Sequence, residues 1–166
     1  MNRFKRLIRH LRNTSATGRR LFPASTLKAI EEAIAAGEKA HRAEIRLVVE
    51  PALQPGHVWQ GMTARERARE LFTLYRIWDT EENCGILIYV NLADHKVEII
   101  ADRGVSGVLG KHEWQEICHT MTRGFAQGDF HGSTIAALEQ LNGLLQSRFP
   151  ADGRAGHELS NRPLII

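Results

Sequence analysis

The residues best suited to chemistry in this sequence are oxygen-bearing side chains that flank two apolar runs. They comprise four side chains before the run 86–90 and one after the run 97–101: Asp79, Glu81, Glu82, Asn83 and Asp102. A short polar turn joins the runs, so they should form antiparallel strands, and the start of one should meet the end of the other. Hard cations such as calcium take about six to eight oxygen ligands. The pattern therefore predicts a calcium site, with magnesium as the alternative, at one edge of the sheet.

The ligands expected for this cation are Asp79, Glu82, Asn83 and Asp102. The loop before Glu44 should lie at the same edge, because the strand that follows it is expected to run parallel to 86–90. That loop and the turn add the outer candidates Glu38, Glu81 and His41. The spacing is not that of an EF-hand loop. The alternative interpretation is a solvated turn, in which Asp79 caps a backbone N–H and Asp102 pairs with Arg103.

The elements that must position these side chains follow from hydrophobic periodicity. We expect a helix over about 24–36, an alternating strand over 44–50, a loop over 51–62 and a helix opened by the capping box Thr63–Glu66. The run 86–90 is apolar on both faces, which indicates a central strand covered on each side. Two further helical stripes precede residue 150. The prediction is an α/β protein, a compact α/β/α sandwich. Its central mixed sheet combines a βαβ unit with an antiparallel hairpin strand, and helices lie on both faces.

Three segments are expected along the 166 residues: a basic arm and linker over 1–20, the folded domain over 21–150, and an extended tail over 151–166 that packs on the domain. No run approaches the ~18–20 apolar residues of a membrane-spanning helix. The basic start has no signal-peptide core, so a cytoplasmic location is expected. Cys84 and Cys118 are too few for a disulfide framework and are expected to be buried.

The net charge of +3 conceals an asymmetry between the arm and the rest of the chain. Residues 1–20 hold seven of the 22 basic residues and no acid, so the remainder holds 15 bases against 19 acids. A mildly acidic body argues against a nucleic-acid partner.

The arm itself could form a short helix, because Phe4, Leu7, Ile8 and Leu11 recur at helical spacing. Its bases are Arg3, Lys5, Arg6, Arg9 and Arg12. In one interpretation they hold the protein at anionic lipid, peripheral to the inner membrane, or at an acidic partner. In the other, the helix packs on the domain and its bases are solvated.

Candidates for anion binding are Arg67, on the helix that follows the capping box, and Arg103. Solvated arginines balanced by Glu66 and Glu70 are the alternative for the helix. The loop from Gly104 to Gly110 precedes a helix but matches neither a Walker loop nor a dinucleotide fingerprint. No nucleophile elbow or paired-histidine zinc motif is present, and no nucleotide or haem cofactor is expected.

Several of these residues, taken in order, resemble the TPM domain. The similar stretches are Phe22-Pro23, the run from Glu38 through His41 to Arg46, Arg65-x-Arg67-Ala68, Trp78-Asp79-Thr80, Asn83 to Tyr89, Val97 to Gly104, Gly128-Asp129-Phe130, Phe149-Pro150 and Glu158-Leu159. The resemblance covers about Leu21 to Leu164. The family includes a thylakoid-lumen protein linked to photosystem II repair, a nematode receptor modulator and bacterial proteins encoded beside LemA-type genes. This chain resembles the short bacterial branch without a signal peptide or transmembrane tail.

The resemblance implies a compact α/β sandwich and two classes of function. Several members bind calcium, and Asp79, Asn83 and Asp102 match acidic-edge positions of the family. The first hypothesis is a non-catalytic calcium-binding and protein-interaction module with a membrane-associated partner, such as a LemA-type or sister TPM protein. Some members are described as acid phosphatases, so the second is a metal-assisted phosphatase acting on phosphomonoesters. In it, Arg67 or Arg103 would stabilise the phosphoryl oxygens. Phe22-Pro23 stands where the secreted members carry an early acidic residue.

Overall fold

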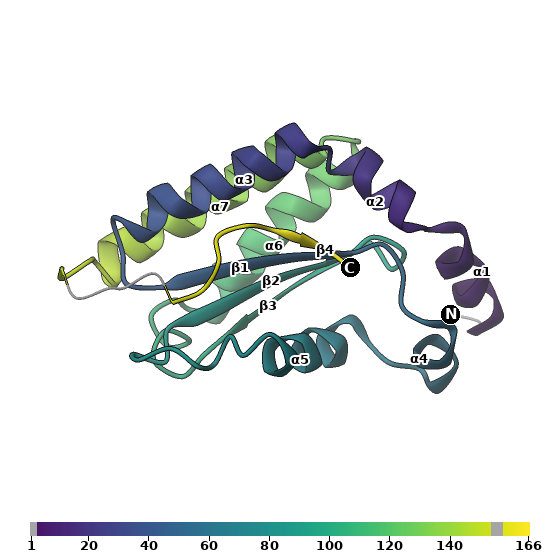
Figure 1. Cartoon of the computed structure of the whole chain (residues 1–166), viewed down its shortest axis with the longest axis horizontal. Helices are drawn as coiled ribbons and strands as arrows, with labels where there is room; N and C mark the ends of the chain where they lie inside the picture. The colour runs from purple at the N-terminus through teal and green to yellow at the C-terminus, as the bar shows by residue number, and fades with distance from the viewer. Residues whose placement is uncertain (1–2, 154–157) are drawn as a thin grey trace.

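A four-stranded sheet in the order β3-β2-β1-β4 forms the centre of the molecule (Figure 1). The structure is a computed structural model that describes residues 3–153 and 158–166. Strands β1 (Glu44–Glu50) and β2 (Gly85–Asn91) are parallel, and β3 (Lys96–Ala101) returns antiparallel to β2. The short β4 (Leu164–Ile165) lies parallel to β1 on its other side. The mixed sheet and the hairpin expected from the sequence are confirmed.

Helices cover both faces of this sheet. The helices are α1 (Arg3–Arg12), α2 (Ser15–Leu21), α3 (Ala24–Glu38), α4 (Pro55–Gln60), α5 (Ala64–Leu74), α6 (Lys111–Ala126) and α7 (Phe130–Arg148). Figure 1 shows α3, α6 and α7 over one face and α5 under the other. The predicted α/β sandwich is therefore confirmed. None of the described helices has both the length and the apolar content needed to cross a bilayer.

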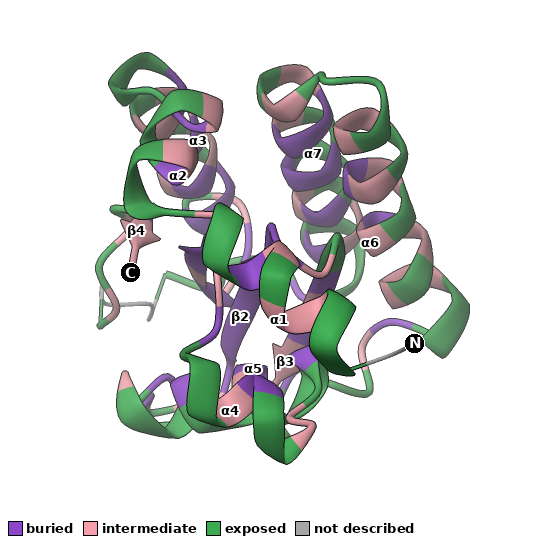
Figure 2. Ribbon diagram, turned by 90° about the vertical axis from the view of Figure 1, so that its right-hand side faces the viewer, coloured by how far each residue is buried: buried purple, intermediate pink, exposed green. Residues whose placement is uncertain are grey.

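The core divides into two clusters because successive strand side chains point to opposite faces. In β1, Ile45, Leu47 and Val49 contact the larger cluster under α3, α6 and α7, whereas Val48 belongs to the smaller cluster over α5. All seven residues of β2 are buried, as expected for a strand covered on both sides. Figure 2 shows this burial concentrated in the sheet and in the inner faces of the long helices.

The start of α5 follows the predicted capping box. The Thr63 hydroxyl accepts a hydrogen bond from the Glu66 N–H at 3.2 Å, and the Glu66 carboxylate accepts one from the Thr63 N–H at 2.8 Å. Both free N–H groups are satisfied by this exchange, so the helix begins where the sequence indicated.

Two short helices lie where the sequence suggested a linker and a loop. Helix α2 occupies most of the expected linker, and its first turn is capped by Thr14. Helix α4 lies within 51–62, where Pro55 fits the first turn and Gly61 ends the helix with φ of 83°. Both helices are too short for an apolar stripe to reveal them, because fewer than two turns give no usable periodicity.

Residues 158–166 run back along the sheet as a strap. The carboxylate of Glu44 accepts a hydrogen bond from the Leu159 N–H at 3.0 Å, and β4 then pairs with Val48 and Val49. Leu159, Leu164 and Ile166 pack against the smaller core cluster. The strap therefore covers the edge of β1 that would otherwise be open.

Candidate functional site

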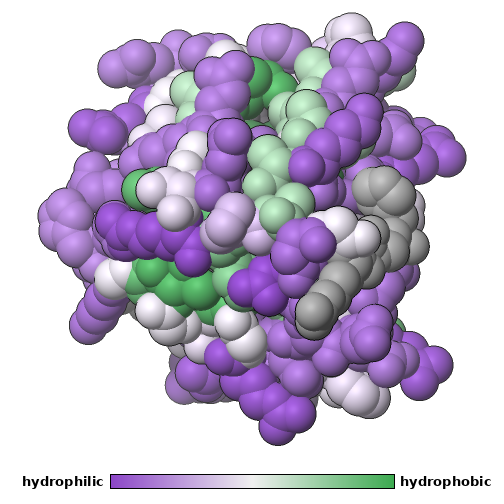
Figure 3. Space-filling view, turned by 90° about the vertical axis from the view of Figure 1, so that its left-hand side faces the viewer, coloured by the Kyte–Doolittle hydropathy of each residue, from purple (hydrophilic) through white to green (hydrophobic). Residues whose placement is uncertain are grey.

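The start of β2 and the end of β3 meet as predicted, and the loops that flank them are joined by backbone hydrogen bonds. The Asp102 N–H donates to the Gly85 carbonyl at 2.9 Å, and the Gly104 N–H donates to the Asn83 carbonyl at 2.9 Å. Residues 79–83 and 102–104 therefore lie together, and we call them the acidic edge. Figure 3 looks onto this end of the molecule, where hydrophilic side chains surround smaller apolar areas.

The Asp102 carboxylate has one oxygen in use and one without a partner. Its Oδ1 accepts a hydrogen bond from the Arg103 N–H at 2.7 Å. Its Oδ2 is buried and has no hydrogen-bond partner among the described residues. A buried carboxylate oxygen that lacks a donor is costly, by about 1–3 kcal/mol or more. This oxygen is the feature of the acidic edge that most needs a ligand.

The loop that faces Asp102 is tightly fixed. Asn83 has a left-handed φ of 52°, a conformation in which asparagine is enriched. The Thr80 hydroxyl accepts a hydrogen bond from the Cys84 N–H at 2.9 Å. A Cβ on Gly104 would lie 2.2 Å from the Glu82 carbonyl oxygen, so the two loops approach too closely for any larger residue. These contacts hold the backbone carbonyl oxygens of Glu82 and Asn83 against Gly104, two residues after Asp102.

Two of the remaining acidic candidates at this edge are paired with arginines. Asp79 pairs with Arg76 at 3.2 Å, and both side chains are more than half exposed. Glu82 pairs with Arg42 at 3.1 Å, which brings the loop before β1 to the same edge as predicted. The backbone N–H of Glu81, by contrast, donates to the carboxylate of Glu158 in the strap.

The outer candidates Glu38 and His41 are buried and have structural partners. One oxygen of Glu38 accepts a hydrogen bond from the Ile45 N–H at 3.0 Å, which ties the end of α3 to the start of β1. The Nε2 atom of His41 lies 3.1 Å from the Asn142 side-chain oxygen. Burial lowers the pKa of His41, so this imidazole is neutral at pH 7. Both side chains are therefore engaged in holding the fold, and the structure gives neither of them a place among the predicted cation ligands.

Across the described part of the chain, no group of three or more His, Cys, Asp or Glu side chains is arranged to hold a metal ion. A calcium site need not be built from side chains alone, because backbone carbonyls, amides and water also serve as ligands. At the acidic edge, two such carbonyl oxygens, those of Glu82 and Asn83, lie against Gly104 in the same segment as Asp102. Of the predicted ligands, Asp102, Asn83 and Glu82 lie in the two joined loops, whereas Asp79 is paired with Arg76.

The two anion-binding candidates lie at different ends of the sheet. Arg103 is exposed at the acidic edge. Arg67 lies toward the other end, where its guanidinium donates to both carboxylate oxygens of Glu50 at 2.9 and 3.1 Å. The Tyr89 hydroxyl donates to the same carboxylate at 2.6 Å. Arg67 is thus part of a buried network and is not available to an anion at the acidic edge.

Sequence reasoning missed this network around Glu50. Burial raises the pKa of Tyr89 well above its ordinary value, and the Glu50 carboxylate beside it raises it further, so the hydroxyl stays a donor. Asn91 completes the set by donating to the Tyr89 oxygen at 3.1 Å. The available signal was a tyrosine within an otherwise aliphatic strand, because a buried phenol usually needs a polar partner.

A second polar cluster fixes the basic arm. The Asp94 carboxylate, in the turn after β2, lies 2.6 Å from Arg6, 2.5 Å from Arg9 and 3.1 Å from His10. Burial opposes ionisation of Asp94, but the close contacts with His10 and Arg6 outweigh it and hold its pKa well below the ordinary value. Two of the arm's predicted lipid-binding bases are therefore engaged within the protein.

An open groove of about 970 Å³ runs along the outer edge of β3 between α5 and α6. Its walls include Arg65, Glu98, Lys111, Trp114 and Cys118. Arg65 donates to the Ile99 carbonyl at 2.7 Å and so occupies part of the strand edge. Burial raises the pKa of Cys118 to about 12, so its thiol is protonated and unreactive at neutral pH. The groove is concave but holds no activated nucleophile.

Comparison with known proteins agrees with this architecture. The family model of the TPM domain matches residues 17–144, a range that includes the acidic edge and leaves out α1. The NMR structure of the BA42 protein from the psychrophilic bacterium Bizionia argentinensis is similar to this chain at 26% identity. That match covers 86% of this chain and 94% of BA42, with a TM-score of 0.75. The search of curated proteins found no match.

Proposed function

Because this chain belongs to the TPM domain family, we propose that it is a non-catalytic module that binds a divalent cation, calcium in preference to magnesium, at the acidic edge. The bound cation would order the side chains of the two loops, whose backbones are already held, and present them to a protein partner, for which a membrane-associated protein is our expectation. The observation that carries the proposal is the buried Oδ2 atom of Asp102, which has no partner among the described residues.

A cation would satisfy this oxygen without dismantling the fold. The candidate ligands are the Asp102 carboxylate, the side chains of Asn83 and Glu82, and backbone carbonyls of the fixed loop. Recruiting Glu82 means breaking its pair with Arg42, in which both side chains are about one-third exposed. Partly exposed pairs of this kind contribute only about 0–1 kcal/mol. The cation would therefore compete with weak interactions and gain a strong one.

The alternative proposal, a metal-assisted phosphatase, has less support from the site. A phosphoryl group at the acidic edge would need cationic groups to stabilise its oxygens. Arg67 is held by Glu50 toward the other end of the sheet, so it cannot serve there. Arg103 lies at the acidic edge, and the two other arginines placed there, Arg42 and Arg76, are paired with Glu82 and Asp79. The geometry thus favours binding over hydrolysis.

The proposal is tested by titrating calcium into the purified protein, with calorimetry and backbone NMR as readouts and magnesium as the comparison ion. We expect shifts confined to residues near 79–84 and 102–104. Asp102→Asn keeps the shape of the side chain but removes its charge, and should weaken binding about tenfold or more. The matched control is Glu32→Gln, which removes an exposed carboxylate on α3 and should leave the affinity unchanged.

Two outcomes would overturn the binding proposal. One is the absence of any shift at the acidic edge at millimolar calcium, and the other is equal calcium affinity in Asp102→Asn and the unsubstituted protein. Metal-dependent hydrolysis of a phosphomonoester such as p-nitrophenyl phosphate, lost in Asp102→Asn, would instead support the phosphatase alternative.

A further inference from the structure

Helix α1 is docked with its polar face inward and its apolar face outward. Arg6, Arg9 and His10 point to Asp94, and His10 is buried. The apolar side chains of Phe4, Ile8 and Leu11 are 62%, 37% and 62% exposed, and Leu7 in the same stripe is half-buried. This is the reverse of an ordinary surface helix, which buries its apolar stripe against the core.

The inward face is held by specific contacts, so the outward face is fixed in place. Besides Asp94, Arg6 donates to the Met62 carbonyl at 2.6 Å, and the Nδ1 atom of His10 accepts a hydrogen bond from the Leu53 N–H at 2.9 Å. These bonds join α1 to the turn after β2 and to the segment that contains α4. The helix therefore presents its apolar side chains already folded, without the ordering cost of a free peptide.

Helix α4 adds an exposed tryptophan at the same end of the molecule. Trp59 is 63% exposed, and α4 packs directly against α1. Figure 2 looks onto this end and shows the two helices together, with most of their residues exposed. We call Phe4, Ile8, Leu11 and Trp59 the apolar end face.

The charges on the two helices that form this face are of one sign. Neither α1 nor α4 contains an acidic residue, and Arg3, Lys5 and Arg12 are exposed. A second copy of the same face would bring like charges together, which disfavours self-association. Apolar and aromatic side chains bordered by bases fit the boundary between lipid headgroups and acyl chains, where each base near an anionic surface contributes about 1 kcal/mol.

We propose that the apolar end face docks on an anionic lipid surface, inserting Ile8, Leu11 and Trp59 while Arg3, Lys5 and Arg12 contact the headgroups. Arg6 and Arg9 take no part, because they hold the helix on Asp94. The surface includes α1, which lies outside the range matched by the TPM domain model. The inference is independent of cation binding at the acidic edge.

The test is sedimentation of the full chain with vesicles of phosphatidylcholine alone and of phosphatidylcholine mixed with phosphatidylglycerol. We expect binding to the anionic vesicles that weakens at high salt. Leu11→Asn and Trp59→Ser should each reduce the affinity about tenfold or more, because each removes most of one inserted side chain. The matched controls are Leu74→Asn and Trp78→Ser, which alter side chains that are 66% and 46% exposed outside this face and should bind as before.

A second measurement follows Trp59 directly. In a chain carrying Trp78→Phe and Trp114→Phe, emission from Trp59 should shift to the blue on anionic vesicles and be quenched by brominated lipid. No binding to anionic vesicles, unchanged Trp59 emission, or equal losses in the test and control variants would overturn the proposal. Self-association that Leu11→Asn abolishes, without vesicle binding, would overturn it in favour of a second copy of the chain.

Discussion

At the scale of single residues, Gly104 decides whether the acidic edge can form. A Cβ at this position would meet the backbone oxygens of Glu82 and Asn83 at 2.2 and 2.7 Å. Gly104→Ala should therefore destabilise the protein by about 1–3 kcal/mol, because backbone atoms must move to make room. Urea unfolding measures this loss. Gly107→Ala in the same loop meets nothing within 4 Å and should change stability by less than about 0.5 kcal/mol. Equal losses of stability in the two variants would show that glycine is required at position 104 for loop flexibility and not for the close approach of the two loops.

The same scale shows what single residues reveal from sequence. Asp102 was identifiable as part of an acidic edge, because the strand pattern alone brings it beside Asn83. Its unpartnered oxygen was not identifiable, since hydrogen bonding at one atom depends on coordinates. Arg67 looked like a solvated or anion-binding residue, and its partner Glu50 lies 17 positions away on another element. Sequence spacing finds neighbours within one helix, but it cannot rank partners across elements.

At the scale of elements, Asp94 is the residue that docks α1. Asp94→Asn should lower the free energy of unfolding by roughly 2–3 kcal/mol, because the side chain of Arg6 is only 12% exposed and would lose its counter-charge. Hydrogen exchange of the α1 amides should quicken more than exchange in the sheet. Glu98→Gln, which breaks the more exposed pair with Arg65, is the control and should cost less than about 1 kcal/mol. Unchanged α1 exchange in Asp94→Asn would contradict this assignment.

Acid should release the same helix. The folded-state pKa of Asp94 is lowered, so its contribution to stability is present above the unfolded-state value of about 4 and is lost as the pH falls below it. The protection factors of the α1 amides, which correct for slower intrinsic exchange in acid, should therefore fall below about pH 4. This fall should be absent in Asp94→Asn. An identical acid response in both proteins would assign the effect to other carboxylates.

Elements with a clear hydrophobic pattern or capping motif could be predicted from the sequence, but the orientation of α1 on the domain could not. The strands, the βαβ order and the start of α5 followed from alternation, apolar runs and the capping box. For α1 the stripe of Phe4, Leu7, Ile8 and Leu11 left packing and lipid binding open. The outcome depends on Asp94, 85 to 88 positions away, whose affinity for Arg6 and Arg9 exceeds what a short apolar stripe gains by burial. The local sequence of α1 carries no information on this competition between distant ion pairs and burial of the apolar stripe.

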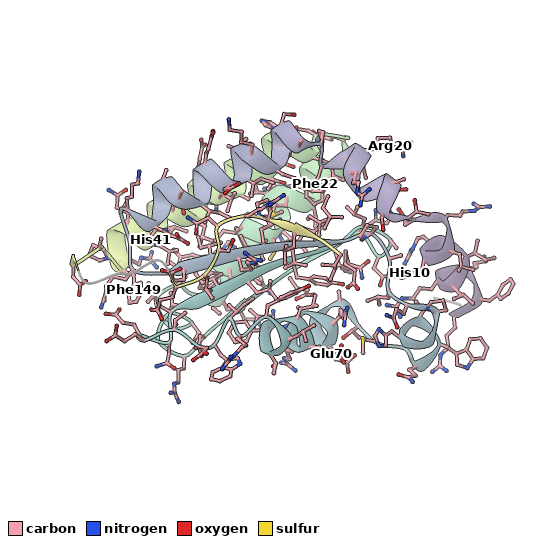
Figure 4. The ribbon with its side chains drawn as sticks, in the orientation of Figure 1. His10, Arg20, Phe22, His41, Glu70 and Phe149 are labelled. Atoms are coloured by element: carbon pink, nitrogen blue, oxygen red, sulfur yellow. The ribbon has the colours of Figure 1, made fainter. Side chains whose placement is uncertain are left out.

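At the scale of the whole molecule, the two proposed sites lie at opposite ends of the sheet. His41, near the acidic edge, and His10, beside the apolar end face, mark these ends in Figure 4. The seven-residue strands β1 and β2 span the distance between them, about 23 Å. Sites that far apart and without shared partners should act additively.

Additivity gives a test that separates the two proposals. Calcium also binds anionic lipid directly, so its effect on vesicle sedimentation should be the same in the unsubstituted protein and in Asp102→Asn. Leu11→Asn should in turn leave the calcium affinity within about twofold, because no ligand of the acidic edge contacts α1. If Asp102→Asn instead removes part of the calcium effect on vesicle binding, the sheet transmits cation binding from one end to the other. The protein would then be a calcium-regulated membrane-binding module.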